Sequence, residues 1–141
     1  MPIPRPKILS VVTVPTGGWT FQFKISAAGS LDTTCTATIA AGDYFMAFDN
    51  QTDDFIYKVN DAINDAVAAS AGRLSGKRPC IVEINGANAK GKVRIYWDTA
   101  DLAGTPNGDI SMLWFSGTGQ SSTVASVLGF DNSADDTSTS V

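Results

Sequence analysis

The chain has 141 residues, of which 43% are hydrophobic and 17% charged, and its formal net charge is −4. This length indicates one domain with a sizeable core, and the acidic balance disfavours nucleic acid or an anionic membrane as a partner. The sequence contains no histidine, which excludes Ser-His-Asp and Cys-His catalysis and every metal site that needs an imidazole ligand.

The first seven residues alternate with proline, at Pro2, Pro4 and Pro6. Because each proline fixes φ and removes a backbone donor, residues 1–7 are predicted to form an extended arm rather than a packed element. The arm either crosses a neighbouring subunit or frays, and the sequence leaves both open. The same segment lacks the apolar core of a secretory signal peptide, so we expect synthesis in the cytoplasm.

Three strands are expected before the first helix. Residues 8–14 are rich in β-branched side chains and end at a Pro-Thr-Gly-Gly turn signal. Residues 19–25 alternate apolar and polar side chains, which is typical of a strand with one buried and one solvent-exposed face. Residues 33–39 form a Thr-rich third segment. The sequence Gly42-Asp43-Tyr44 then leads towards the helix.

The clearest helical pattern lies between residues 55 and 67. Thr52 is predicted to cap its start, with Asp53 and Asp54 in the first turn, and Gly72 is predicted to end it. A helix of about 16–18 residues with one apolar stripe must lie on a sheet. The stripe comprises Phe55, Ile56, Val59, Ala62, Ile63, Ala66 and Val67, and the polar side comprises Lys58, Asn60, Asp61, Asn64 and Asp65.

A β-hairpin is predicted after the helix. Residues 80–84 and 92–98 are the two strand-like segments, and Asn85-Gly86 supplies turn chemistry between them. Tyr96 falls on the face opposite Trp97. Tyr96 is therefore the aromatic side chain that we expect to be exposed.

The chain closes with a strand and a short helical turn. Residues 110–115 are apolar almost throughout, as in a central strand covered on both faces. Ser121 or Ser122 is expected to cap the helical turn. Gly129 is expected to end it in the left-handed conformation, with Phe130 folding back onto Val124 as in a Schellman ending.

The predicted fold is therefore α+β, with a mainly antiparallel sheet of about six strands packed by one long amphipathic helix, plus a short C-terminal helical turn. We expect an extended Pro-rich arm over 1–7, a single domain over 8–130 and a flexible acidic Ser/Thr-rich tail over 131–141. Cys35 and Cys80 are expected to be buried free thiols, with a disulfide between them left open.

Two further patterns fall short of a binding site. Gly117-Thr118-Gly119 has Ser122 where a dinucleotide fingerprint needs a third glycine. The acidic stretch 49–54 has Asp54 at the sixth position of a calcium loop, where glycine is required, and Asn60 at the twelfth, where glutamate is required. Since no Cys-x-x-Cys motif or P-loop occurs either, we predict a protein that is not an enzyme and binds no cofactor or metal.

Several short segments follow one another in a particular order. They are Gly42-Asp43-Tyr44, the helix over 55–67, the hairpin around 81–83 and 93–95, Leu113-Trp114 and Val127-Leu128-Gly129-Phe130. In this order and spacing, over about residues 33–130, the chain resembles a small module of bacteriophage virion proteins. Such modules occur in tails, baseplates, fibres and head-associated proteins, and the family has no catalytic residues to carry over. Residues 45–49 are longer and more apolar than the helix entry of that family, and strands 8–25 lie outside the resemblance.

The resemblance implies a non-enzymatic structural component of the virion, in the tail or tail tip, that contacts copies of itself and other virion proteins. The alternative is a capsid decoration module, or a host-surface module that binds glycan through Tyr96. Neither nucleic acid nor membrane is an expected partner. The candidate subunit contacts pair the cationic arm with the acidic tail, and they involve Arg5, Lys7, Asp131, Asp135 and Asp136.

Overall fold

The computed structural model describes residues 10–26, 33–46, 54–70, 75–84, 93–97 and 109–138. Within these residues, eight strands and two helices form an α+β fold in which every strand pairing is antiparallel, which confirms the predicted class. The elements in chain order are β1 (Ser10–Val14), β2 (Trp19–Ser26), β3 (Thr33–Ile39), β4 (Gly42–Met46), α1 (Asp54–Ala68), β5 (Cys80–Ile84), β6 (Val93–Trp97), β7 (Asp109–Met112), α2 (Ser121–Leu128) and β8 (Asp136–Ser138).

The central sheet has the strand order β3-β2-β7-β8. β2 pairs with β3 on one side and with β7 on the other, so its backbone lies in the middle of the sheet. Phe21 and Phe23 point to the core face and are fully buried, whereas Lys24 is exposed, as the alternation predicted. The opposite face of β3 presents the exposed side chains of Thr34, Thr36 and Thr38.

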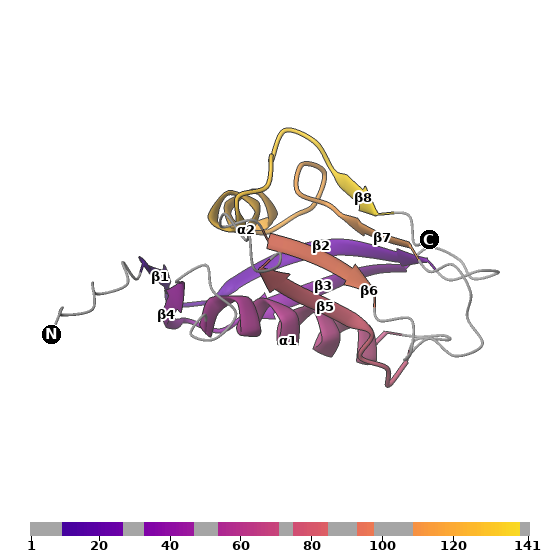
Figure 1. The fold of residues 1–141 in the computed structure, drawn as a ribbon, viewed down its shortest axis with the longest axis horizontal. Coiled ribbons are helices and arrows are strands. Elements are labelled where there is room, and N and C mark those ends of the chain that lie inside the picture. The colour runs from indigo at the N-terminus through magenta and orange to yellow at the C-terminus, as the bar shows by residue number, and fades with distance from the viewer. Residues whose placement is uncertain are drawn as a thin grey trace, which may run out of the picture.

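The strand β4 was not predicted: Gly42-Asp43-Tyr44 leads into a strand that pairs with β1, not directly towards a helix. The β1–β4 ladder continues the β2–β3 ladder as one long hairpin with a bend. At the bend, residues 15–18 lie opposite residues 40–41, between the pairs Val14–Gly42 and Trp19–Ile39. In this way the hairpin ends in a two-stranded ribbon at one end of the molecule (Figure 1).

α1 covers the core face of the hairpin and lies against β3, β4 and β5 (Figure 1). Its apolar stripe is buried as predicted except at Ala66, which is partly buried; Phe55 and Ile63 are at 0% exposure. Phe55 contacts the rings of Trp19 and Tyr44, at centroid distances of 6.3 and 6.1 Å. The helix has 15 residues and is shorter than expected. It ends at Ala68, before the predicted end at Gly72. Thr52, Asp53 and Gly72 themselves lie outside the described residues.

β5 and β6 form the predicted hairpin, in which Glu83 lies directly opposite Arg94. The predicted turn at 85–86 lies outside the described residues. Cys80 at the start of β5 is buried, and so is Cys35 on β3. Both are free thiols, as expected.

The last predicted strand ends earlier than expected. β7 stops at Met112, and the chain turns because Gly117 donates its N–H to the carbonyl of Leu113, at 2.9 Å. Trp114 therefore lies in a turn and not in the strand. Its ring is fully buried between Phe21 and Phe130, and its Nε1–H has no hydrogen-bond partner among the described residues.

α2 ends as predicted, but it does not begin as predicted. Gly129 has φ 86°, and the N–H groups of Gly129 and Phe130 donate to the carbonyls of Ser126 and Ala125, which is the Schellman pattern. The ring that Phe130 contacts is that of Trp114, at 5.4 Å. The N-cap residue is Gln120, without a side-chain cap.

Neither of the two predicted capping serines is available as a cap. Ser121 Oγ accepts the N–H of Gln22 at 3.0 Å and donates to the carbonyl of Thr118, and Ser122 Oγ donates to the carbonyl of Trp114. Both hydroxyls are used to hold α2 to the rest of the fold.

The expected flexible tail is in part a strand. β8 pairs with β7, with Asp136 opposite Met112, so residues up to 138 extend the central sheet. A local Ser/Thr/Asp composition did not reveal this pairing, because the partner strand lies more than twenty residues earlier in the chain. Residues 139–141 lie outside the described residues, as does the predicted arm over 1–7.

Candidate interaction surfaces

Asp135 holds the turn that follows β7. Its Oδ1 accepts the N–H groups of Phe115 and Ser116, both at 2.9 Å, and its Oδ2 accepts the hydroxyl of Ser116. These bonds, first of all the one from the Ser116 hydroxyl, lower the pKa of Asp135 below its ordinary value. The predicted contact residue Asp135 therefore has a structural role within its own chain.

Asp131 closes a small turn in the same region. Its carboxylate accepts the hydroxyl and the N–H of Ser133, and these bonds lower the pKa of Asp131. Asp136 is exposed on β8. The structure thus places the three predicted aspartates in one short segment, while Arg5 and Lys7, their predicted partners, lie outside the described residues.

One apolar side chain stands out beside this acidic segment. Phe115 is 66% exposed on the turn that Asp135 holds, whereas the neighbouring Trp114 is fully buried. The sequence prediction of a continuous strand missed this exposure, since it placed both residues in a covered central strand.

The ribbon of β1 and β4 carries a second exposed apolar pair. Val11 is 55% and Phe45 49% exposed, and the two residues lie directly opposite each other in the ladder. Thr13 and Asp43 form the next pair on the same face, because side chains alternate along each strand. We call these four residues the ribbon face. The other face of the ribbon packs on the core through the buried Val14 and Met46.

Tyr96, the predicted exposed aromatic, is only partly exposed. The guanidinium carbon of Arg94 lies 4.1 Å from the centre of the Tyr96 ring, a cation–π contact. Arg94 also approaches Glu83 across the hairpin, at 3.7 Å. One face of the tyrosine ring is therefore covered by the chain's own arginine, which leaves less of the ring for a sugar to stack on.

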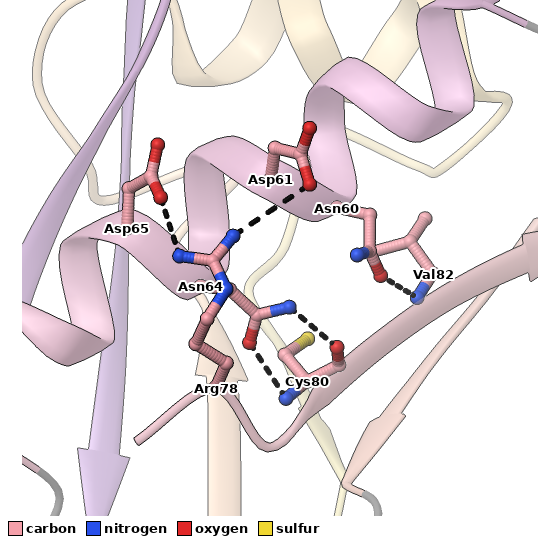
Figure 2. Close-up of polar contacts among 7 residues, drawn as sticks. All are labelled: Asn60, Asp61, Asn64, Asp65, Arg78, Cys80 and Val82. Atoms are coloured by element: carbon pink, nitrogen blue, oxygen red, sulfur yellow. Dashed lines mark hydrogen bonds and ion pairs between the residues drawn. The ribbon is translucent and has the colours of Figure 1, made fainter. Parts of the chain in front are cut away.

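The sequence prediction missed a polar connection between α1 and β5. It placed Asn64 on the solvent-exposed side of the helix. Asn64 is buried, and its side-chain amide pairs with both backbone groups of Cys80, at 2.8 and 2.9 Å (Figure 2). One turn earlier, Asn60 Oδ1 accepts the N–H of Val82 at 2.7 Å. The helix thus occupies the hydrogen-bonding edge of β5 with side-chain amides in place of another strand.

At the surface beside these amides, Arg78 forms ion pairs with two aspartates of α1. Its guanidinium bridges Asp61 and Asp65 on α1 (Figure 2). All three side chains are largely exposed, so this network contributes little to stability. The amides of Asn60 and Asn64 are the groups that fix the hairpin to the helix.

The Gly-Thr-Gly sequence between β7 and α2 serves close packing. A Cβ at Gly119 would overlap Thr20 Oγ1, and a Cβ at Gly117 would overlap the carbonyl oxygen of Leu113. The same loop hydrogen-bonds to β2: the N–H of Gln120 donates to the carbonyl of Thr20 at 2.6 Å, and Gln120 Oε1 accepts the N–H of Thr20 at 2.9 Å. The loop therefore continues the pairing of β2 beyond the end of β7.

No group of three or more His, Cys, Asp or Glu side chains that could hold a metal occurs among the residues that the structure describes. In the same residues, neither helix is long and apolar enough to cross a membrane. No protein-family model, curated protein or solved structure matches this chain.

Proposed function

We propose that this protein is a non-enzymatic structural component of a bacteriophage virion, placed in the tail or tail tip, where it works through repeated contacts with copies of itself and with other virion proteins. The proposal starts from the order of sequence segments that resembles a virion module. The observation that carries it is the ribbon face, on which the apolar side chains of Val11 and Phe45 lie side by side and about half exposed.

An adjacent pair of exposed apolar side chains is the kind of surface that a partner covers. The ribbon carrying it lies at one end of the fold (Figure 1), and within the described residues β1 and β4 pair only with each other. Strands with an unpaired edge offer backbone donors and acceptors to a neighbouring chain. Among the described residues, the ribbon thus combines an apolar face with unpaired strand edges, and both features favour contact with another subunit.

The test is antibody-gold labelling of intact particles from a lysate in which this protein is expressed, viewed by electron microscopy. Gold confined to the tail is the expected result, and it would also locate the subunit. Gold over the head would move the protein to the alternative, a capsid decoration module. Unlabelled particles in a lysate rich in the protein would contradict the proposal, provided that particles opened by mild denaturation are unlabelled too.

The alternative of glycan binding has its own test. Loss of glycan-array binding in Tyr96→Ala, with binding retained in Phe115→Ala, would favour it. Because Arg94 covers one face of the Tyr96 ring, we expect no specific glycan binding by the wild-type protein.

A further inference from the structure

The ribbon face is too small to hold two copies together by itself. Stable interfaces bury roughly 800 Å² on each partner, from about 20–30 residues a side, whereas the ribbon face consists of Val11, Thr13, Asp43 and Phe45. Two globular surfaces meeting only here would bury too little area. An extended segment laid along the face is a better match to a surface that is two strands wide.

Residues 1–9 have the composition of such a segment. They include the apolar side chains Ile3, Ile8 and Leu9, the cations Arg5 and Lys7, and no acidic residue. Three prolines reduce the conformational entropy that the segment loses on binding, and Pro-rich segments bind to exposed aromatic side chains. On the ribbon face, Phe45 supplies the aromatic ring and Asp43 the opposite charge.

The position of this segment in the chain indicates which copy it binds. Residue 9 directly precedes Ser10, which pairs with Met46 at the outer end of the ribbon, so the extended direction of β1 leads away from Val11 and Phe45. Nine extended residues span about 30 Å, and a five-residue strand spans about 17 Å. A two-fold axis near this end of the ribbon would bring each segment across the ribbon face of the other copy.

We propose that two copies of this chain exchange residues 1–9, each segment lying over the Val11–Phe45 pair of the other copy. This inference rests on the proposed function, since it names the partner of the ribbon face. The contact is reciprocal, so it closes at two copies. The Phe115 surface is the less suitable receptor, because it offers one apolar side chain and because Asp135 beside it already accepts hydrogen bonds from its own chain.

The first experiment is sedimentation velocity on the full chain over a range of concentrations. We expect a monomer–dimer equilibrium for the wild type. Phe45→Ser and the double variant Arg5→Glu/Lys7→Glu are each expected to raise the dimer dissociation constant about tenfold or more. The matched controls are Phe115→Ser and Asp136→Lys, which remove an exposed aromatic ring and reverse an exposed aspartate elsewhere, and they should change the constant less than about twofold.

Reversing the charges on both sides of the contact distinguishes a direct contact of Arg5 and Lys7 with Asp43 from a loss of folding. Asp43→Lys alone should weaken the dimer, and combining Asp43→Lys with Arg5→Glu/Lys7→Glu in one chain should restore it. A damaged fold would not be restored by adding two further substitutions. Circular dichroism and thermal unfolding of each variant check that the fold is retained.

Three results would overturn the inference. They are a wild type that stays monomeric at the highest concentration reached, an assembly that grows past two copies, and a dimer weakened as much by Phe115→Ser as by Phe45→Ser. The proposed function is tested separately by gold labelling. Labelled tails with a monomeric protein would refute only the exchange, and a dimer absent from particles would refute only the virion role.

Discussion

At the scale of single residues, two glycines with positive φ angles meet different surroundings. Gly129 has φ 86° at the end of α2, and a Cβ there would meet no atom within 4 Å. Gly119 has φ 70° in the loop before α2, and a Cβ there would lie 2.8 Å from the carbonyl oxygen of Thr20 and closer still to Thr20 Oγ1. A side chain at position 129 would therefore strain only the backbone conformation, whereas one at position 119 would also collide with Thr20 on β2.

This difference predicts an order of stability for two variants. Gly129→Ala should lower the free energy of unfolding by about 1 kcal/mol through left-handed strain alone. Gly119→Ala should cost at least about 2–3 kcal/mol, because the methyl group must also push β2 away from the loop. Urea unfolding followed by tryptophan fluorescence measures both. Equal losses would show that the loop does not rest on Thr20 in solution.

The buried thiols lead to a second prediction at this scale. Burial raises the pKa of Cys80 to about 12 and also raises the pKa of Cys35. Since the thiolate is the reactive form, neither cysteine should react with a disulfide reagent near pH 8 while the protein is folded. Two thiols should be titrated after unfolding in urea. Rapid modification of the native protein would contradict the burial of these side chains.

At the scale of elements, the connection between α1 and β5 depends on two asparagines with different burial. Asn64 satisfies both backbone groups of Cys80 in the core, and Asn60 satisfies the N–H of Val82 in a less buried position. We predict that Asn64→Ala lowers stability by about 2–4 kcal/mol and Asn60→Ala by about 1 kcal/mol. Chemical denaturation measures both losses. An Asn64→Ala loss no larger than that of Asn60→Ala would mean that water replaces the lost amide.

The turn held by Asp135 makes the attachment of β8 dependent on pH. The folded-state pKa of Asp135 lies below the ordinary value of 3.8. Its contribution to stability is therefore fully present above that unfolded value and is lost as the pH falls through the lower folded value. Asp135→Ala should lose this contribution at neutral pH and should show a weaker fall in stability below about pH 4 than the wild type.

Thermal unfolding between pH 2.5 and 7 tests this prediction, with Asp136→Ala as the control. Asp136 is the next residue, exposed at the start of β8, and no hydrogen bond to its carboxylate occurs among the described residues. A wild-type profile that is unchanged by Asp135→Ala would show that the turn does not depend on the carboxylate.

The elements that the sequence predicted correctly are those whose pattern is local. The apolar stripe of α1, the alternation of Phe21 and Phe23 and the left-handed Gly129 each follow from side chains within one element. β4 and β8 could not be predicted in this way, because their hydrogen-bond partners lie in β1 and β7, far away in the sequence. Asn64 was misplaced for the same reason, since its partner is the backbone of β5.

The candidate contact residues were also chosen from local sequence, which does not reveal the partners of a side chain elsewhere in the fold. Charge alone identified Asp131 and Asp135, but the turns at Ser133 and Ser116 already use their carboxylates. The exposure of Val11 and Phe45 was not predicted, since it results from the bend that carries the ribbon beyond the central sheet. Composition could indicate an arm and an acidic segment, but it could not indicate which apolar side chains are exposed.

At the scale of the whole molecule, β2 has the most extensive backbone pairing of the described strands. It is bonded to β3, to β7 and, past the end of β7, to the loop before α2. We predict that the amides of Phe21 and Phe23 exchange with solvent more slowly than those of the β1–β4 ribbon, which opens without disturbing the central sheet. Native-state hydrogen exchange by NMR tests this order. Equal protection in both regions would show that the ribbon and the sheet unfold as one unit.

The antiparallel pairing of β1 with β4 also has a mechanical consequence. A pull transmitted through residues 1–9 enters the fold at Ser10 and runs along the axis of β1, while β4 is held by α1. The hydrogen bonds of an antiparallel ladder run across the strands, so such a pull shears all of them together and does not break them one after another. A subunit tethered in this way would resist tension along its first strand far better than tension applied sideways to it.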